Sequence, residues 1–519
     1  MAIRISGMNS GLDTESIVSA LVSSYATKRD KYVKAQTKLS WKADAYKAAN
    51  TKVYDLYTSM NKLRFTAAYS LKKTTVSDST KASITASSSA INGTQTLKIN
   101  NLATAGYLTG GELGSDITSS STLADLGYNT SNGSGTIDIN GTSISVDSTT
   151  TISDFVSQLN DAGVTASFDA TNKRIFVSSS DTGADNDFSL SASDENGLKA
   201  LSSLGLVTTD LLKSYASDQG IDTSSDEYTA LKTTYLNSSA ARVEGENASI
   251  TLNGADFESA TNSFTVNGLT INATGETGDD EITITTATDV DGIYDTIKDF
   301  FTQYNEVVNY LQGAYNADSA KGYEPLTDDE KAEMTDTQVE KWEAKIKDSL
   351  LRRDSTIGNI LNVMSNSMSK TYTINGSNYS LGSFGISTLG YFTADADEQY
   401  AYHIDGDEDD SYTSANADKL KAAINEDPDA VIELMKNVTN DLYTNLGNQM
   451  KSTSLSSAYT IYNDKEMANE YSDYTDLIST WEDRLAEMED RYYQQFTAME
   501  KALATLQSNS SALSGLLGS

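Results

Sequence analysis

Heptad repeats at both ends of the chain constrain its fold more than any other feature. Near the N-terminus, residues spaced alternately three and four apart form a seam in which 12 of 14 positions are apolar or aromatic. This spacing places the seam on one helix face and is typical of a coiled coil. A continuous helix of this length would measure roughly 70 Å, too long for a compact domain. The seam comprises Val18, Leu21, Tyr25, Lys28, Tyr32, Ala35, Leu39, Lys42, Tyr46, Ala49, Val53, Leu56, Met60 and Leu63.

A second seam near the C-terminus has the same spacing but the opposite charge. Residues 1–73 hold 13 basic and 5 acidic residues, whereas residues 464–501 hold 4 and 11. Because apolar seams and opposite charges favour pairing, we expect the two ends to meet as a hairpin-like stalk, with Tyr46 near the stretch from Trp481 to Met499. Two independent core helices are the alternative. The seam comprises Tyr474, Ile478, Trp481, Leu485, Met488, Tyr492, Gln495, Met499, Ala502 and Leu506.

Between the two seams the pattern changes to short alternating runs interrupted by Asn-Gly. This dipeptide suits the positive φ angles of a two-residue hairpin loop, so the runs predict an antiparallel, β-rich region. The five examples are Asn92-Gly93, Asn140-Gly141, Asn253-Gly254, Asn267-Gly268 and Asn375-Gly376.

Residues 135–178 have the pattern of a self-contained module with a hairpin, a helix and two strands. The helix would follow a cap at Ser153 and Asp154, and its apolar face would hold Ile152, Phe155 and Leu159. Residues 113–135 and 208–241 are rich in Ser, Thr and Asp with weak periodicity, which predicts the boundaries of an inserted domain.

Helical spacing returns after residue 293. Thr327 with Glu330 and Thr337 with Glu340 have the form of capping boxes, and Asp427-Pro428 supplies a cap with proline at the first helical position. We therefore predict an α+β multidomain protein with a coiled-coil stalk, a mixed helical leg and antiparallel β-rich head domains inserted in mid-chain. The expected divisions are 1–70 and 451–519 for the stalk halves, the first extending into the leg, 71–112 plus 242–292 for one head domain, 113–241 for the inserted head domain, and 293–450 for the helical leg.

Composition excludes several classes of chemistry. The chain has no cysteine and one histidine, so disulfides and thiolate metal sites are excluded and a Ser-His-Asp enzyme has little support. A formal charge of −35 makes nucleic acid a poor partner. No signal-peptide core and no run of about 18 apolar residues occurs, so we expect no membrane insertion. We expect no cofactor, no metal and no catalytic residue.

The acidic run from Ile404 to Asp410 is the strongest metal-like feature. Asp405, Asp407 and Asp409 alternate as in a calcium loop, but Asp410 stands where the loop needs glycine and Asn416 where it needs glutamate. We therefore expect a solvated hairpin here. We also expect that replacing His403 or Asp407 leaves stability unchanged.

Two segments resemble a known family. The sequence from Gly7 to Leu21, which contains Gly11, Leu12 and Asp13, resembles the opening of the flagellar hook-associated protein 2 family, the filament cap proteins. Tyr323–Lys331 and Lys341–Asp354 resemble a second family segment, which contains Trp342, Arg352, Arg353 and Asp354. Residues 134–207 are similar to the hook/flagellin insertion module of the family's head, and 208–241 match no part of the family.

The resemblance implies a structural assembly factor and no enzyme. Its members form a ring, commonly of five subunits, at the distal tip of the bacterial flagellar filament, where they promote flagellin polymerisation and prevent loss of unpolymerised flagellin. They are exported by the flagellar type III apparatus and act outside the cell. The implied partners are further copies of the chain, flagellin, the filament tip, the hook-associated junction proteins and an export chaperone.

Two other functions fit parts of the sequence. Another flagellar axial protein, at the hook-filament junction or in the filament itself, would share the terminal heptads and the exported composition. A surface adhesin, glycan-binding protein or glycosidase would use the abundant acids and tyrosines, although no defined site appears. The two motif segments favour the cap.

Overall fold

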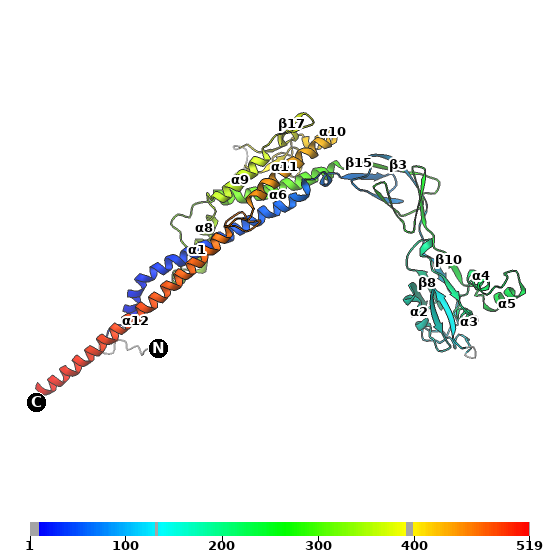
Figure 1. The fold of residues 1–519 in the computed structure, drawn as a ribbon, viewed down its shortest axis with the longest axis horizontal. Coiled ribbons are helices and arrows are strands. Elements are labelled where there is room, and N and C mark those ends of the chain that lie inside the picture. Colours follow the sequence, from blue (N-terminus) through cyan, green and yellow to red (C-terminus); the bar gives the residue numbers. More distant parts are fainter. Residues whose placement is uncertain (1–9, 130–132, 391–397, 518–519) are drawn as a thin grey trace. The chain divides into compact units, whose positions relative to one another are not determined.

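The computed structural model describes residues 10–129, 133–390 and 398–517 of the chain. These residues divide into two units, one formed by residues 1–70 with 290–519 and the other by residues 71–289. Long helices dominate the first unit and antiparallel sheets the second (Figure 1). The predicted α+β class, with terminal helices and β-rich regions between them, is confirmed.

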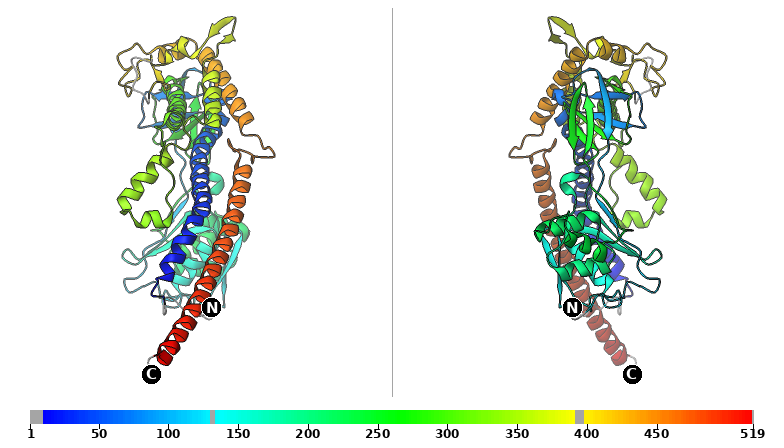
Figure 2. Two further views of the ribbon diagram at one scale, coloured as in Figure 1. Left: turned by 90° about the vertical axis from the view of Figure 1, so that its left-hand side faces the viewer. Right: turned by 90° about the vertical axis from the view of Figure 1, so that its right-hand side faces the viewer.

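The first unit is built on the two terminal helices. Helix α1 (Thr14–Leu63) begins behind Asp13, whose carboxylate accepts a hydrogen bond from the backbone N–H of Ser16 at 3.1 Å. A carboxylate at this position also interacts favourably with the positive end of the helix dipole. Helix α12 (Asp464–Leu517) runs beside α1, as both Figure 1 and the views in Figure 2 show. We call this pair the terminal coil.

The C-terminal half of α1 packs in a second assembly, which we call the leg bundle. Helices α6 (Val290–Asn316), α9 (Ser355–Met368) and α11 (Pro428–Gln449) contribute apolar faces to its core. The Thr439 hydroxyl of α11 donates to the carbonyl of Leu63 at 3.1 Å and so caps the end of α1. The remaining elements of the unit are η1 (Thr66–Ala68), α7 (Asp328–Ala332), α8 (Asp336–Asp348), β16 (Tyr372–Ile374), β17 (Ser377–Tyr379), η4 (Leu381–Phe384), β18 (Ile386–Thr388), β19 (Tyr402–Ile404) and α10 (Lys419–Glu426).

The second unit has two hydrophobic cores. One lies under a five-stranded antiparallel sheet of order β1-β15-β3-β11-β12 and a three-stranded sheet of order β13-β14-β2. Alternating side chains of these strands face the core, as the period-two pattern predicts. The strands are β1 (Lys72–Val76), β2 (Ala82–Ala86), β3 (Gly93–Asn101), β11 (Ala248–Leu252), β12 (Ala255–Ser259), β13 (Ser263–Val266), β14 (Leu269–Ala273) and β15 (Ile282–Thr288).

The other core lies between two antiparallel sheets and four helices. The sheets have orders β10-β4-β8-β7 and β6-β5-β9. The elements are β4 (Tyr107–Thr109), β5 (Gly135–Ile139), β6 (Thr142–Val146), α2 (Ile152–Asp161), β7 (Val164–Asp169), β8 (Arg174–Ser179), η3 (Ala184–Asn186), β9 (Leu190–Ala192), α3 (Glu195–Ser203), α4 (Thr209–Asp218), α5 (Asp226–Tyr235) and β10 (Ala241–Val243).

Four of the five Asn-Gly dipeptides close hairpins as predicted. They join β5 to β6, β11 to β12, β13 to β14 and β16 to β17, and each asparagine has a φ angle between 49° and 51°. The prediction for Asn92-Gly93 is wrong, because Gly93 starts β3 and no strand pairs across this dipeptide. The Asn92 side chain instead bonds Lys72 and Thr288.

The predicted order of a hairpin, a helix and two strands at residues 135–178 is confirmed, but the module is not self-contained, because β4 pairs with β8 and β9 pairs with β5. Its helix cap also needs a correction. Ile152, Phe155 and Leu159 are fully buried on one face of α2. The cap is Thr151, which forms a capping box with Asp154, and not the Ser153/Asp154 pair. A similar shift affects α8, where Thr335 and Gln338 form the box in place of Thr337 and Glu340, while the box of Thr327 and Glu330 is confirmed.

Residues 113–135 and 208–241 do more than separate domains. Leu123 and Tyr128 of the first segment are buried in the core of the module, and so are Leu212 and Tyr215 of α4. Helices of only ten residues with few apolar positions give a weak periodic signal, which explains why the sequence pattern missed α4 and α5.

Candidate functional site

The two helices of the terminal coil meet through aromatic, polar and charged contacts. The rings of Tyr32 and Tyr474 lie 6.4 Å apart between centroids, and the Gln36 amide donates to the Thr475 hydroxyl at 2.7 Å. The Lys28 ammonium lies 5.0 Å from the centre of the Trp481 ring. Lys28 interrupts the apolar seam in the sequence, yet its position over an indole makes it part of the pairing.

The register of the coil differs from the expected one. Tyr46 stacks on Tyr462 with centroids 4.9 Å apart, and Trp481 lies beside Lys28. The predicted proximity of Tyr46 to the stretch from Trp481 to Met499 is therefore wrong. Three lysines of α1 form ion pairs with the leg residues Glu306, Glu330 and Asp354.

The seam residues fall into two groups by burial. The seam residues in the C-terminal half of α1 are buried in the leg bundle, and the most exposed of them, Tyr46, is 7% exposed. In the terminal coil, Leu21 and Tyr25 are each 39% exposed and Leu506 is 64% exposed. The buried seam residues are Val18, Tyr46, Ala49, Val53, Leu56, Met60, Leu63 and Leu485, and the partly buried ones are Tyr32, Ala35, Leu39, Lys42, Tyr474, Ile478, Trp481, Met488, Tyr492 and Met499.

Asp354 ties the middle of α1 to the leg bundle. Its carboxylate caps α9, accepts a hydrogen bond from the Tyr46 hydroxyl at 2.6 Å and lies 3.1 Å from the Lys42 ammonium. Burial raises the pKa of Asp354, but the bonds from Tyr46 and Lys42 outweigh burial and hold the pKa below its ordinary value. Burial raises the pKa of Tyr46 well above its ordinary value. The hydrogen bond that the phenol donates to the Asp354 carboxylate, and the negative charge of this carboxylate, raise it further.

The other motif residues have structural roles. The Trp342 indole donates to the carbonyl of Glu324 at 2.8 Å and packs against Tyr323. Arg353 has a φ angle of 53°, and its backbone N–H donates to the carbonyl of Tyr315 at 2.9 Å. Arg352 is exposed. At the other segment Gly11 adopts a φ of 69°, Leu12 is exposed and Asp13 caps α1.

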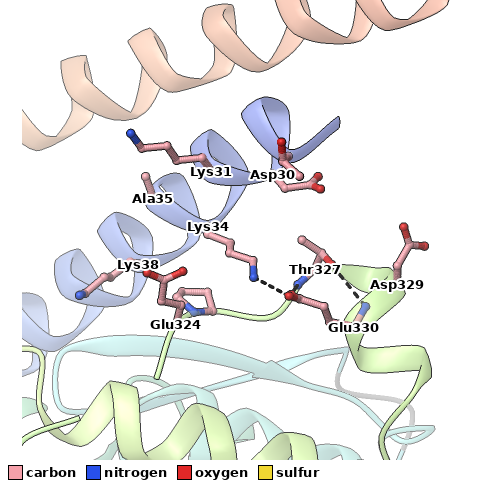
Figure 3. Close-up of a pocket in the computed structure, with 11 residues that line it drawn as sticks. Asp30, Lys31, Lys34, Ala35, Lys38, Glu324, Thr327, Asp329 and Glu330 are labelled. Atoms are coloured by element: carbon pink, nitrogen blue, oxygen red, sulfur yellow. Dashed lines mark hydrogen bonds and ion pairs between the residues drawn. The ribbon is translucent and has the colours of Figure 1, made fainter. Parts of the chain in front are cut away.

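A cleft of about 600 Å³ opens between α1 and the segment that leads into α7. Figure 3 shows Lys31, Lys34 and Lys38 on the α1 side and Glu330 with Thr327 on the other. The Lys34 ammonium bonds the Glu330 carboxylate at 2.7 Å, and this carboxylate also accepts from the backbone N–H of Thr327. The bond from Lys34 and the N–H of Thr327 lower the pKa of Glu330. The cleft thus joins opposite charges and does not have the converging groups of a catalytic site.

The acidic run is wrongly predicted as a solvated hairpin. The Lys298 ammonium lies 2.6 Å from carboxylate oxygens of both Asp407 and Asp409, and Asp407 is only 9% exposed. His403 is buried and bonds Asp410. Lys298 lies about a hundred residues before the run, so local spacing could not reveal this pairing.

Within residues 10–129, 133–390 and 398–517, no three metal-ligating side chains gather into a candidate metal site. Over the same part of the chain, no helix has both the length and the apolar character needed to cross a bilayer.

Comparison with known proteins identifies the family. The model for the flagellar hook-associated protein 2 C-terminus matches residues 245–508, and the model for the N-terminus of the same protein matches residues 10–106. Flagellar hook-associated protein 2 of Halalkalibacterium halodurans is 24% identical, with 96% of this chain and 97% of the relative covered. The Escherichia coli protein of the same name is 25% identical, with 98% and 96% covered.

A solved structure supports the fold. The crystal structure of the D1-D2-D3 domains of the flagellar cap protein FliD from Escherichia coli matches with a TM-score of 0.51 and 21% identity, covering 79% of this chain and 96% of that one. The two family models together span the terminal coil, the leg bundle and the first β-rich core. The chain therefore belongs to the flagellar hook-associated protein 2 family and is an exported, extracellular protein that caps the distal tip of the flagellar filament.

Proposed function

We propose that the terminal coil is the element that docks the cap on the filament tip. The observation that carries this proposal is the unfinished seam of the coil. Ser10, the first described residue, bonds Glu500, so the last 17 described residues of α12 extend beyond that contact. At 1.5 Å per residue this extension measures roughly 25 Å. Leu506 and Leu513 on it are 64% and 61% exposed.

Exposed leucines on a long helix need a partner. A two-helix coil with a half-exposed seam buries little apolar surface, so it gains most of its stability from further packing. The filament tip is the partner that we propose for this packing. We therefore assign docking to the coil, with the chain acting structurally and performing no catalysis.

Self-association into a ring, commonly of five copies in this family, is the second part of the proposal. The net charge of −35 makes copies repel one another at low ionic strength. At about 0.5 M salt the Debye length falls to roughly 4 Å, which screens this repulsion. Sedimentation should then show one discrete oligomer replacing the monomer as salt rises. A monomer at every salt and protein concentration would contradict the ring.

We also propose two head domains and two further kinds of partner for the chain. The separate cores around β3 and around α2 support two head domains, residues 71–112 with 242–292 and residues 113–241, beside the leg of 293–450 and the stalk halves 1–70 and 451–519. We assign the heads to the plate that retains flagellin at the tip. An export chaperone and the hook-associated junction proteins are the further partners that we propose.

Replacing the exposed leucines tests the docking role. We expect Leu506→Glu with Leu513→Glu to leave the protein folded, because both side chains are exposed, but to shorten filaments and release unpolymerised flagellin into the medium. Filament length and secreted flagellin should be measured in cells whose own cap gene is deleted.

A charge-matched control separates docking from charge. Ser508→Glu with Ser510→Glu adds the same charge to exposed positions of α12 without removing apolar surface. This variant should support filaments of normal length. Normal filaments with the double leucine variant would show that these leucines do not dock the cap.

A further inference from the structure

His403 is the single histidine of the chain and lies in an unusual environment within the first unit. It sits on β19 and is 7% exposed. The side chain lines a cleft of about 360 Å³ between α6, the segment before β19 and the loop that follows β19. Nothing in filament capping calls for a titratable group at this place.

Two carboxylates flank the imidazole. Nδ1 lies 2.6 Å from Oδ2 of Asp410, and Nε2 lies 3.8 Å from Oε2 of Glu398. Nε2 is buried and has no hydrogen-bond partner. A neutral imidazole that donates from Nδ1 carries a lone pair on Nε2, so it would present this lone pair to a second carboxylate. Only the protonated ring, which donates from both nitrogens, matches both neighbours.

The surrounding charges also favour the protonated ring. Strand β19 and the following loop contribute Asp407, Asp409 and Asp410 to the cleft, and the segment before β19 contributes Glu398. Helix α6 contributes one cation, Lys298, which bonds Asp407 and Asp409. Four carboxylates and one ammonium leave a net charge of −3 when the imidazole is neutral. The uncharged groups that face the ring are Tyr412, with its ring edge-on 5.5 Å away, Tyr402, and Ser387 across the ladder on β18.

We propose that His403 is a proton-operated clasp that joins the segment before β19 to the loop after it. When the ring is protonated, Nε2–H donates to Glu398 while Nδ1–H donates to Asp410. The Glu398 side chain is 35% exposed and can close the remaining distance of about 1 Å to hydrogen-bond length. When the proton leaves, the Glu398 contact becomes repulsive and this side of the clasp opens.

Asp409, Asp410 and Lys298 keep their charge over the range in which histidine titrates, about pH 5 to 8. Burial raises the pKa of Asp410, but hydrogen bonds from the backbone of Tyr412 and from His403 hold it below its ordinary value. The bond to Lys298 lowers the pKa of Asp409. Burial lowers the pKa of Lys298, but its bonds to Asp407 and Asp409 raise it above its ordinary value. The clasp is therefore closed when the ring is protonated, and the Glu398 side opens when the ring loses its proton.

Hydrogen exchange of the intact chain tests the clasp. Protection of the amides of residues 398–413, corrected for the intrinsic pH dependence of exchange, should fall roughly tenfold between about pH 6 and pH 8. Selective ¹⁵N labelling of the single histidine should show protons on both ring nitrogens at the lower pH. Equal corrected protection at the two pH values would overturn the proposal.

A neutral isostere sharpens the test. The amide of Glu398→Gln can donate to the lone pair on Nε2, so the variant should keep its protection at both pH values. Glu408→Gln is the matched control, because Glu408 is exposed on the same loop and does not line the cleft. The control should retain the wild-type pH dependence. Wild-type pH dependence in Glu398→Gln would show that Glu398 is not the partner and would overturn the clasp.

Discussion

The two halves of α1 carry the same heptad pattern but meet different surroundings. From Tyr46 to Leu63 the seam is buried against α6, α9 and α11, and Leu56 is 1% exposed. From Leu21 to Leu39 the seam lies beside α12, with Ala35 also lining the cleft before α7, and Leu21 is 39% exposed. The pattern therefore identifies which face of a helix is apolar, but not how many partners cover that face. One half belongs to a folded core, and the other half stays partly exposed.

Truncating matched leucines should produce the largest difference between the halves. Leu56→Ala removes a fully buried side chain and should cost about 2–5 kcal/mol of unfolding free energy. Leu21→Ala, at a half-open position, should cost less than about 1 kcal/mol. Denaturant unfolding of the first unit, followed by its tryptophan fluorescence, measures both. Equal costs would mean that the two halves of the seam are equally buried in solution.

Replacing Asp354, which ties the middle of α1 to the leg bundle, should have the next largest effect on the free energy of unfolding. Asp354→Ala leaves α9 uncapped and leaves Lys42 and Tyr46 without their acceptor, so we expect a loss of about 2–4 kcal/mol. Arg352→Ala, two positions earlier and exposed, is the control and should stay within about 0.5 kcal/mol of wild type. A loss with the control as large as with Asp354→Ala would contradict the assigned tie.

The lowered pKa of Asp354 also predicts that the stability of the protein depends on pH in the acidic range. Because the folded pKa of Asp354 lies below its ordinary value of about 3.9, its contribution is complete above that pH and disappears as the pH falls through the folded pKa. Wild type should therefore lose more stability than Asp354→Asn between about pH 4 and pH 2. Parallel losses, read from thermal unfolding monitored by circular dichroism, would exclude Asp354 as a contributor.

Weakening the terminal coil should change exchange and not global stability. Trp481→Ala removes the ring beneath Lys28, a contact worth about 0.5–1 kcal/mol at an exposed site. Amides of residues 20–40 should exchange several-fold faster, while those of residues 46–63 stay unchanged. Faster exchange in both ranges would indicate that the two halves unfold together.

The smallest effect is expected at the cleft beside α1. Lys34→Ala breaks the ion pair with Glu330, in which Glu330 is 45% exposed, so we expect a cost of about 0.2–1 kcal/mol that shrinks at high salt. Lys38→Ala, which removes a neighbouring lysine of the same cleft, should cost less. A cost above 2 kcal/mol would place the pair among the buried ties of the leg bundle.

Features that repeat or that use local geometry were predictable from the sequence. Asn140-Gly141 and three similar dipeptides close hairpins because both residues accept positive φ angles, and Asp427 with Pro428 starts α11 as the capping rules require. The hairpin prediction for Asn92-Gly93 was wrong, and in the structure the asparagine side chain forms hydrogen bonds with Lys72 and Thr288. A local signal is overridden where a distant strand supplies competing bonds.

Contacts between distant residues were not predictable. Lys298 meets Asp407 across 109 residues, and the carboxylates of the acidic run look solvated unless that lysine is known. The expectation that replacing His403 or Asp407 leaves stability unchanged stays a prediction, although both side chains are buried. The register of the terminal coil was missed because Tyr462, which lies before α12, takes the place beside Tyr46. The heptads identify which face of a helix is apolar. The segments next to the helices determine which residues of α1 and α12 lie side by side.

The placement of the indoles gives the molecule a built-in optical reporter. All three tryptophans, Trp41, Trp342 and Trp481, belong to the first unit, and residues 71–289 contain none. Trp41 and Trp481 each lie within 5.0 Å of a lysine ammonium. Emission excited at about 295 nm therefore comes only from the coil and leg, and charge movement at these lysines would shift its colour. Unlabelled protein can thus report binding at the coil and leg, while residues 71–289 contribute no tryptophan emission.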